Sequence, residues 1–198
     1  MEAWEREVYL LNTQQSRYQK KLKESLKIIK DTLAICESPY ISFSCGKDSS
    51  VMAHMMLAID NTIPLRFLSS GETRLVFNVD DIIHYFEKRG AYVQEILVDR
   101  VFSEEWQEAT WDEQRKAGKG DLNKLNEGDF DCIFMGLRAE ESPPRKLSLY
   151  RHQTDGLPRF TYRYSGEDRK NMIRCCPLAR WTTLDIGGYI LQHDISYL

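Results

Sequence analysis

The residue types that could do chemistry are concentrated in residues 40–50, whose sequence is YISFSCGKDSS. Three hydroxyl side chains and a lysine follow a short apolar run there: Ser44, Lys47, Ser49 and Ser50. Hydroxyl donors and an ammonium group, next to the free N–H groups of a helix N-terminus, suit a phosphate group. We therefore expect this segment to hold the phosphates of a nucleotide. Similar Ser- and Gly-containing turns also occur without a ligand, so both interpretations stay open for this segment alone.

The apolar pattern around this segment predicts the elements that position it. β-branched and aromatic residues before Ser44 predict a buried strand that ends near Phe43. After Val51 the apolar residues take helical spacing: Met52, Met55, Met56 and Ile59. The turn between strand and helix has neither the Gly-x-x-x-x-Gly-Lys-Ser/Thr spacing of a Walker A loop nor a Gly-x-Gly-x-x-Gly dinucleotide fingerprint.

A second polar segment, residues 136–145, follows another predicted strand over residues 131–136. It contains two arginines, two glutamates and a serine: Arg138, Glu140, Glu141, Ser142 and Arg145. Guanidinium groups bind phosphate or sulfate through two parallel hydrogen bonds. A glutamate could orient the arginines or help to hold a metal. The alternative is a surface loop with local ion pairs of little energetic value.

A third segment begins at Cys175 and Cys176 and predicts a capped helix. Thr182 is a favourable N-cap residue, and Asp185 stands three residues later as in a capping box. We expect Trp181, which precedes the cap, to pack in the interior. The adjacent cysteines fit buried thiols better than ligands, although a reactive role stays open.

The remaining apolar segments predict further strands and helices. We expect strands at residues 65–68, 92–98 and 131–136, helices at residues 76–86 and 103–116, and a loop from residue 118 to 129. The polar, aromatic residues 148–174 are expected to be irregular. Strands that alternate with helices indicate an α/β fold, a parallel sheet with helices on both faces. The segments after Phe43, Leu68 and Gly136 would then share the carboxyl edge of the sheet, where ligands bind.

Composition narrows the class of protein. The 198 residues suit a single domain over 1–198, with an N-terminal helical extension at about 2–37. A hydrophobic content of 42% is ordinary for a globular protein, and a formal charge of −3 does not indicate nucleic-acid binding. No apolar run approaches the roughly 20 residues of a membrane span, and no signal-peptide core is present. We expect a cytoplasmic location. Five cysteines, an odd count without a secretory signal, predict reduced thiols, and neither the cysteines nor the four histidines have zinc-binding spacing.

The three segments in this order resemble the phosphoadenosine-phosphosulfate (PAPS) reductase family, within the PP-loop, adenine nucleotide α-hydrolase-like superfamily. The Ser-Gly-Gly-x-Asp-Ser motif is matched by Ser44, Gly46, Asp48 and Ser49, with Cys45 at the first Gly. The Gly-Leu-Arg-x-Glu-x-Ser-x-x-Arg motif is matched by Gly136, Leu137, Arg138, Glu140, Ser142 and Arg145. The Pro-Leu-x-x-Trp-Thr-x-x-Asp segment is matched by Pro177, Leu178, Trp181, Thr182 and Asp185.

The resemblance implies a three-layer Rossmann-like fold and a nucleotide site. The implied nucleotide-binding residues are Ser44, Cys45, Gly46, Lys47, Asp48, Ser49, Ser50, Ser70, Gly71, Arg138, Glu140, Ser142 and Arg145. The implied catalytic residues are Lys47, Asp48 and Arg138, and no metal ligand is assigned. ATP, adenylyl sulfate (APS) or PAPS would be the bound nucleotide, together with Mg²⁺. The N-terminal helix would offer a surface for a homodimer or a partner protein.

Departures from the family leave three hypotheses open. The first is an enzyme of sulfur metabolism acting on ATP or an adenylyl-sulfate nucleotide, by α-phosphate chemistry or sulfur transfer. The second is sulfonucleotide reduction through an atypical thiol, because the Glu-Cys-Gly segment of the reductases is absent from the sequence. The third is a non-catalytic module that serves a partner protein, because the Cβ of Cys45 would narrow the phosphate loop. No Cys-x-x-Cys is present, so a self-contained iron–sulfur cluster is not expected.

Overall fold

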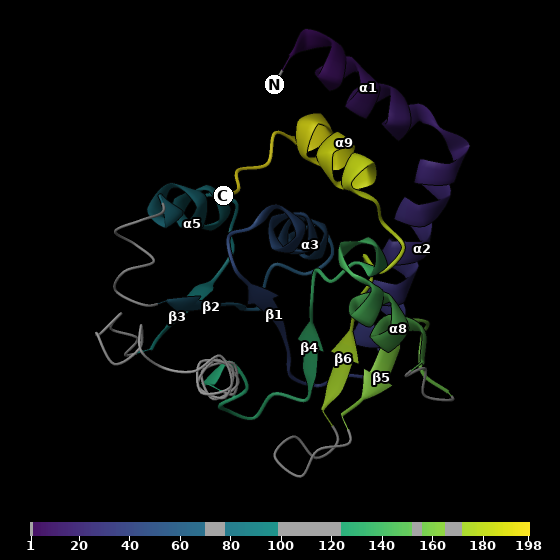
Figure 1. The fold of residues 1–198 in the computed structure, drawn as a ribbon. Coiled ribbons are helices and arrows are strands. Elements are labelled where there is room, and N and C mark those ends of the chain that lie inside the picture. The colour runs from purple at the N-terminus through teal and green to yellow at the C-terminus, as the bar shows by residue number, and fades with distance from the viewer. Residues whose placement is uncertain (1, 70–77, 99–123, 152–155, 165–171) are drawn as a thin grey trace, which may run out of the picture.

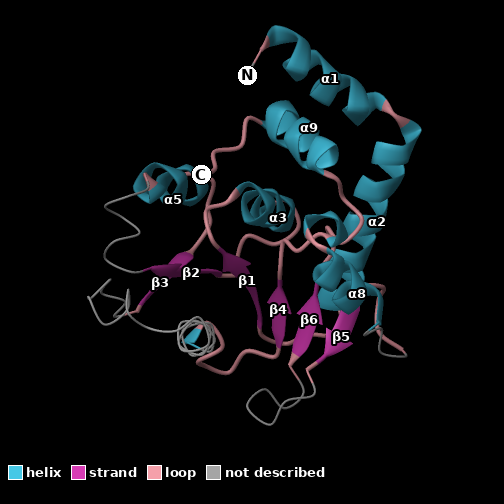
Figure 2. Ribbon diagram, in the orientation of Figure 1, coloured by secondary structure: helices cyan, strands magenta, loops and turns pink. Residues whose placement is uncertain are grey.

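The computed structural model describes residues 2–69, 78–98, 124–151, 156–164 and 172–198. Its centre is a six-stranded sheet in the order β3-β2-β1-β4-β6-β5 (Figures 1 and 2). The strands are β1 (Pro39–Phe43), β2 (Leu65–Ser69), β3 (Val93–Leu97), β4 (Cys132–Phe134), β5 (Thr161–Arg163) and β6 (Ile173–Cys175). Five strands run parallel, and β5 pairs antiparallel with β6. The order of connection reverses between β1 and β4, which is where such sheets bind ligands.

The helices cover the sheet and extend beyond it. They are α1 (Ala3–Gln14), α2 (Ser16–Leu33), α3 (Lys47–Leu57), α5 (Val79–Glu87), the 3-10 helix η1 (Ala139–Glu141), α8 (Pro143–Arg151) and α9 (Thr183–His193). Figure 1 shows α3 and α5 on one face of the sheet, α9 outside α3, and α1 outside α9. At this face α3, α9 and α1 therefore lie at successively greater distances from the strands.

Strand β1 supplies both faces of the sheet with buried side chains. Ile41 and Phe43 belong to the main apolar core, whereas Tyr40 belongs to a smaller cluster with Ile133 and Met172. This alternation follows from the two-residue period of a strand. Buried apolar residues on both faces agree with the predicted α/β architecture.

Two glycines let the N-terminal helix lie close against α9. A Cβ at Gly187 would meet the Tyr9 ring at 2.3 Å, and a Cβ at Gly188 would meet the Tyr9 carbonyl oxygen at 2.7 Å. Tyr9 therefore occupies the space that larger side chains on α9 would fill. The predicted helical extension over about 2–37 is found as two helices, α1 and α2.

The expectation of an irregular segment at residues 148–174 is wrong where the structure describes it. Helix α8 includes Ser148, and β5 and the start of β6 also fall in this range. The strands β5 and β6 have only three residues each, too few for a two-residue period to stand out. The helix expected at 103–116 lies outside the described residues, as do Ser70, Gly71 and Val76.

None of the described helices combines the length and the apolar character needed to span a membrane.

Candidate functional site

A cavity of about 630 Å³ opens at the switch point between β1 and β4. Its walls come from the loop after β1, the first turn of α3, the segment after β4 and the C-terminal residues 197 and 198. The lining residues predicted from sequence are Ser44, Gly46, Lys47, Asp48, Ser49 and Arg145. The structure thus brings the first two predicted segments to one cavity.

The N-terminus of α3 faces this cavity without a side-chain cap from the described residues. Its N-cap residue is Gly46, which has no side chain to accept a hydrogen bond from the first turn. The Ser49 hydroxyl instead donates to the Gly46 carbonyl at 2.9 Å and lies 3.0 Å from Ser44 Oγ. Free first-turn N–H groups and the positive end of the helix dipole therefore remain for an anion.

Cys45 stands in the loop but turns away from the cavity. Its side chain is fully buried in the main core, and its φ of 59° lies in the left-handed region that favours glycine. The family motif carries Gly at this position, which agrees with that conformation. The predicted contact between Cys45 and nucleotide is therefore not supported by its side chain, and its Cβ does not narrow the cavity. Ser50 is also buried, with its hydroxyl 3.4 Å from the Cys45 carbonyl oxygen.

Arg138 links three segments instead of lining the cavity. Its Nε donates to Asp48 Oδ1 at 2.8 Å, and its Nη1 donates to Glu140 Oε2 at 2.8 Å. The same Glu140 oxygen accepts from the backbone N–H of Thr183, at the start of α9, at 2.5 Å. Only 5% of the Arg138 side chain is exposed. The sequence led us to expect that Arg138 holds a phosphate or sulfate. In the structure its guanidinium instead faces two carboxylates, those of Asp48 and Glu140.

Asp48 is held by this arginine at the edge of the cavity. Burial raises the pKa of Asp48, although the Arg138 guanidinium acts in the opposite direction. The carboxylate thus depends on Arg138 for its charged form. We assign Arg138 as the residue that positions Asp48 and η1.

The other charged residues of the second segment pair locally. Arg145 forms an ion pair with Glu141, and both side chains line the cavity. Ser142 Oγ accepts from the backbone N–H of Arg145 at 3.3 Å, so Ser142 caps α8 and does not line the cavity. Glu140 faces a different cavity. Each glutamate thus contacts one arginine, which is one of the two roles that the sequence left open for these glutamates.

Gly136 allows the end of β4 to approach α3. A Cβ at this position would lie 2.7 Å from the Asp48 carbonyl oxygen and 3.0 Å from the Ser49 nitrogen. Both are backbone atoms, which cannot move away without shifting the first turn of the helix. The close approach places the second segment beside the phosphate loop.

Some lining residues were not anticipated from sequence. They are Ser42, Met135, Leu137, Tyr197 and Leu198. The backbone N–H of Leu198 donates to the Cys45 carbonyl at 2.8 Å and so brings residues 197–198 to the loop. Ser42 is the half-buried residue between Ile41 and Phe43 in β1, and because both faces of this strand are buried, no alternation marks it in the sequence. The hydrogen bond between Leu198 and Cys45 joins residues far apart in the chain, so no local sequence pattern predicts it.

The thiols near the site are buried. Cys45, Cys175 and Cys176 are each inaccessible to solvent. Burial raises the pKa of Cys45 and Cys175 to about 12, and that of Cys176 to about 11. A buried thiol with a raised pKa is a poor nucleophile, because the thiolate is the reactive form.

The third segment has the structural role that its sequence predicts. Thr182 caps α9, and Asp185 completes the capping box. The Trp181 ring is 1% exposed, and its indole N–H donates to Ser25 Oγ at 2.9 Å. Asp185 also accepts from Lys21 and from Asn12 Nδ2, which joins α9 to α1 and α2.

The mostly parallel sheet, with the uncapped N-terminus of α3 at its switch point, places the chain among α/β proteins whose architecture suits an anionic ligand. The model of the phosphoadenosine phosphosulfate reductase domain matches residues 38–198. The chain therefore belongs to this family. Helices α1 and α2 precede the matched residues.

Individual relatives agree with this assignment. The chain is 31% identical over 192 residues to sulfate adenylyltransferase subunit 2 of Shewanella pealeana, covering 87% of this chain and 63% of the relative. It is 29% identical over 198 residues to the protein of that name from Buchnera aphidicola, with the same coverage. The chain thus spans about 63% of the length of these relatives.

A solved structure supports the fold. The phosphoadenylyl-sulfate (PAPS) reductase of Candida auris, solved as a phosphate complex, superposes with a TM-score of 0.55. The two sequences are 14% identical, and the match covers 88% of this chain and 81% of the other. The likeness confirms the α/β architecture predicted from sequence.

Proposed function

We propose that the chain binds ATP in the cavity at the α3 N-terminus and transfers its adenylyl group to sulfate. The observation that carries this proposal is the uncapped N-terminus of α3, which faces a cavity of about 630 Å³ together with Lys47 and Arg145. That volume lies within the range of small-molecule sites. The names of the relatives, sulfate adenylyltransferase subunit 2, support the choice of reaction.

In this reaction a sulfate oxygen attacks the α-phosphorus of ATP. The bond from that phosphorus to the bridging oxygen breaks, and pyrophosphate leaves with the electron pair. The first-turn N–H groups of α3 and the Lys47 ammonium would stabilise charge on the phosphate oxygens. Arg145, which lines the same cavity and is 45% exposed beside Glu141, would hold the second anionic group. Catalysis would then rest on positioning and electrostatics.

Mg²⁺ would accompany the nucleotide. Among the described residues no group of three or more His, Cys, Asp or Glu side chains is arranged to hold a metal. Mg²⁺ commonly takes one or two carboxylates together with substrate phosphates. Asp48 is the carboxylate at the phosphate loop that fits this role, and the ion would neutralise charge on the phosphates.

The alternative, reduction of a sulfonucleotide by a protein thiol, is less well supported. It needs an accessible thiolate, and the thiols nearest the loop and the third segment are buried with raised pKa values. The third hypothesis, a degenerate module, loses its steric argument because Cys45 points into the core. Adenylyl transfer requires neither a reactive thiol nor a phosphate loop that has lost its ligand.

The proposal predicts nucleotide binding that depends on Lys47. Its side chain is exposed, and within the described residues it makes no ion pair that a substitution would disrupt. Loss of a charge-assisted hydrogen bond costs about 1.5–3 kcal/mol, so Lys47→Gln should weaken ATP binding roughly tenfold or more. Calorimetry with ATP, adenylyl sulfate and PAPS, with and without Mg²⁺, measures this effect.

Lys88→Gln is the matched control, because Lys88 is exposed at the end of α5 and does not line the cavity. We expect its ATP affinity to equal that of the wild type. Equal ATP affinity in Lys47→Gln, or no binding of any nucleotide, would refute the proposal. Tighter binding of PAPS than of ATP would favour the sulfonucleotide alternative.

We also propose that α1 is the contact surface for another subunit, in the simplest case a second copy of this chain. Trp4, Val8 and Leu11 are 64%, 45% and 56% exposed, and their spacing places them along one side of the helix. The relatives are named as subunits, which supports an assembly.

Sedimentation velocity tests this surface. We expect the chain to self-associate as its concentration rises, and Trp4→Glu to abolish the association because a charge replaces an apolar contact. Leu147→Glu, at an exposed leucine of α8, is the control and should associate as the wild type does. A chain that stays monomeric, or Trp4→Glu behaving as the wild type, would contradict self-association.

A further inference from the structure

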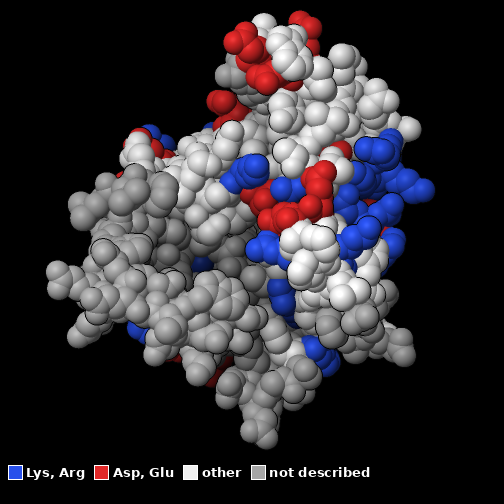
Figure 3. Space-filling model, viewed as in Figure 1, with Lys and Arg blue, Asp and Glu red and all other residues white. Residues whose placement is uncertain are grey.

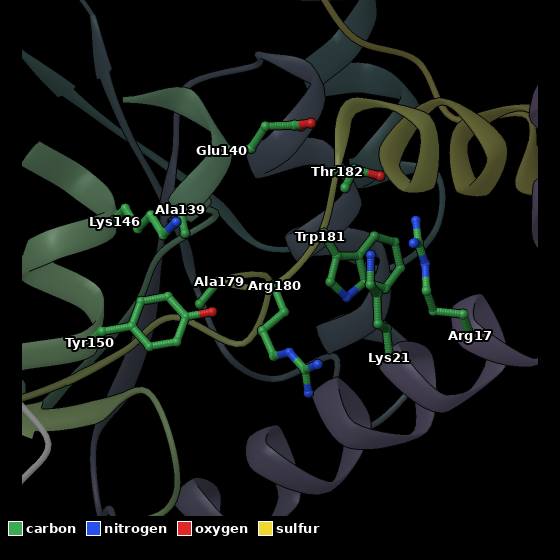
Figure 4. A pocket seen from close by; sticks show the side chains of 10 residues that line it. All are labelled: Arg17, Lys21, Ala139, Glu140, Lys146, Tyr150, Ala179, Arg180, Trp181 and Thr182. Carbon is green, nitrogen blue, oxygen red and sulfur yellow. The ribbon is translucent and has the colours of Figure 1, made fainter. Parts of the chain in front are cut away.

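A second cavity, of about 350 Å³, lies on the other side of η1 from the candidate nucleotide cavity. Ala139 and Glu140 of η1 line this cavity, whereas Glu141 lines the nucleotide cavity. The remaining walls come from α2, from α8 and from residues 179–182 before α9 (Figure 4). The two cavities are therefore neighbours with separate linings.

Basic side chains dominate the lining of this second cavity. They come from three parts of the chain: Arg17 and Lys21 from α2, Lys146 from α8, and Arg180 from the segment before α9. In Figure 4 Lys146 enters from one side and Arg17 from the other, with Arg180 between them. The formal charge of the whole chain is −3, so this concentration does not reflect the general composition.

Two of these cations already have carboxylate partners. Lys21 pairs with Asp185, and Arg180 Nη1 lies 2.9 Å from Glu24 Oε2. Arg17 and Lys146 make no ion pair within the described part of the chain. Two positive charges from different helices thus face one cavity without compensation.

The acidic residue in the lining does not cancel them. Glu140 Oε2 accepts from Arg138 Nη1 at 2.8 Å and from the backbone N–H of Thr183 at 2.5 Å. Its negative charge is therefore already engaged by the network behind the cavity. Figure 3 shows basic side chains gathered over α2 and around α8, with acidic side chains over α1 and also between these basic groups. The field at this cavity favours an anion.

We propose that the second cavity binds a phosphate or sulfate group on its basic lining, with Arg17 and Lys146 at its two ends. A guanidinium can donate two parallel hydrogen bonds to an oxyanion, and an ammonium acts on it as a point charge. The volume lies at the low end of the range for small-molecule pockets and exceeds what a bare oxyanion needs. The ring of Tyr150 and the methyl group of Ala179 form the apolar part of the wall, where the organic part of an ester fits.

Calorimetry on the full chain tests this site with inorganic phosphate, inorganic sulfate and phenyl phosphate. Lys47→Gln is the parent for every variant, because it weakens anion binding in the nucleotide cavity. We expect the parent to bind at least one probe, and Arg17→Gln/Lys146→Gln in that parent to bind it at least tenfold more weakly. Tighter binding of phenyl phosphate than of phosphate identifies an ester as the ligand, and the reverse identifies the free ion.

The matched control is Lys20→Gln/Lys23→Gln in the same parent. It removes two exposed positive charges from α2 that do not line the cavity. We expect unchanged affinity for this control and unchanged circular dichroism for all variants. Equal weakening in the control, no weakening in Arg17→Gln/Lys146→Gln, or no probe binding by the parent would overturn the proposal. The choice of parent rests on the role proposed for Lys47, but no readout here uses a nucleotide, so loss of probe binding and loss of ATP binding are separate results.

Discussion

Arg138→Ala is expected to destabilise the protein by about 3 kcal/mol and to weaken nucleotide binding at least tenfold. Removal of one partner from a buried ion pair typically costs about 3–5 kcal/mol, because the other charge is left without compensation. Here Asp48 loses its partner, and burial already raises the pKa of that carboxyl. Glu140 loses the same contact, which loosens η1 from α9. Urea denaturation and calorimetry with ATP measure the two effects.

The control is Arg159→Ala. Arg159 pairs with Glu24 at 3.0 Å, but 47% of its side chain is exposed, so its loss should cost less than about 1 kcal/mol. Arg138→Lys should recover part of the stability, since one ammonium replaces the charge but not the fork that spans two carboxylates. Wild-type stability together with wild-type ATP affinity in Arg138→Ala would show that Arg138 does not position the site.

Asp185→Ala is expected to destabilise the protein by about 3–5 kcal/mol, a fall in Tm of roughly 10 °C. The side chains of Asp185 and Lys21 are 1% and 9% exposed, so the substitution leaves a buried ammonium without a partner. It also removes the acceptor for Asn12 Nδ2 and for the backbone N–H of Thr182, at 3.0 and 2.8 Å. Thermal unfolding followed by circular dichroism measures the loss.

Two comparisons isolate the buried pair. Lys21→Met in the Asp185→Ala background should recover most of the stability, because the unpaired charge is gone. Asp31→Ala breaks an exposed pair with Lys27 and should cost less than about 1 kcal/mol. A loss in Asp185→Ala no larger than that in Asp31→Ala would contradict the assigned role.

The ionisation of Asp185 predicts that the stability of the protein depends on pH. Burial by itself would raise the pKa of Asp185, but hydrogen bonds from Lys21, Asn12 and Thr182 outweigh it, and the pKa is lowered. A lowered folded-state pKa contributes stability that is complete above the unfolded value of about 3.9 and is lost as pH falls through the folded value. The stability gap between wild type and Asp185→Ala should therefore narrow at acid pH.

The sequence predicted the phosphate loop and the α9 cap because their signals are local. Ser44, Gly46 and Ser49 lie within one turn, and Thr182 and Asp185 are three residues apart. It did not predict β5 and β6, which are short, or the antiparallel pairing of β5. Such a strand is defined by its neighbour in the sheet, and Thr161 meets Cys175 only after folding.

The sequence by itself determined the strand–turn–helix unit, the arginine segment and the family that both resemble. Only the tertiary structure decided what each side chain faces. Cys45 turns into the core, and Arg138 meets Asp48, which is 90 residues away in the chain. Local propensity acts over a few residues, whereas the packing of the core selects partners at any separation. For that reason Arg17 and Lys146, on two separate helices, face one cavity only in the folded protein.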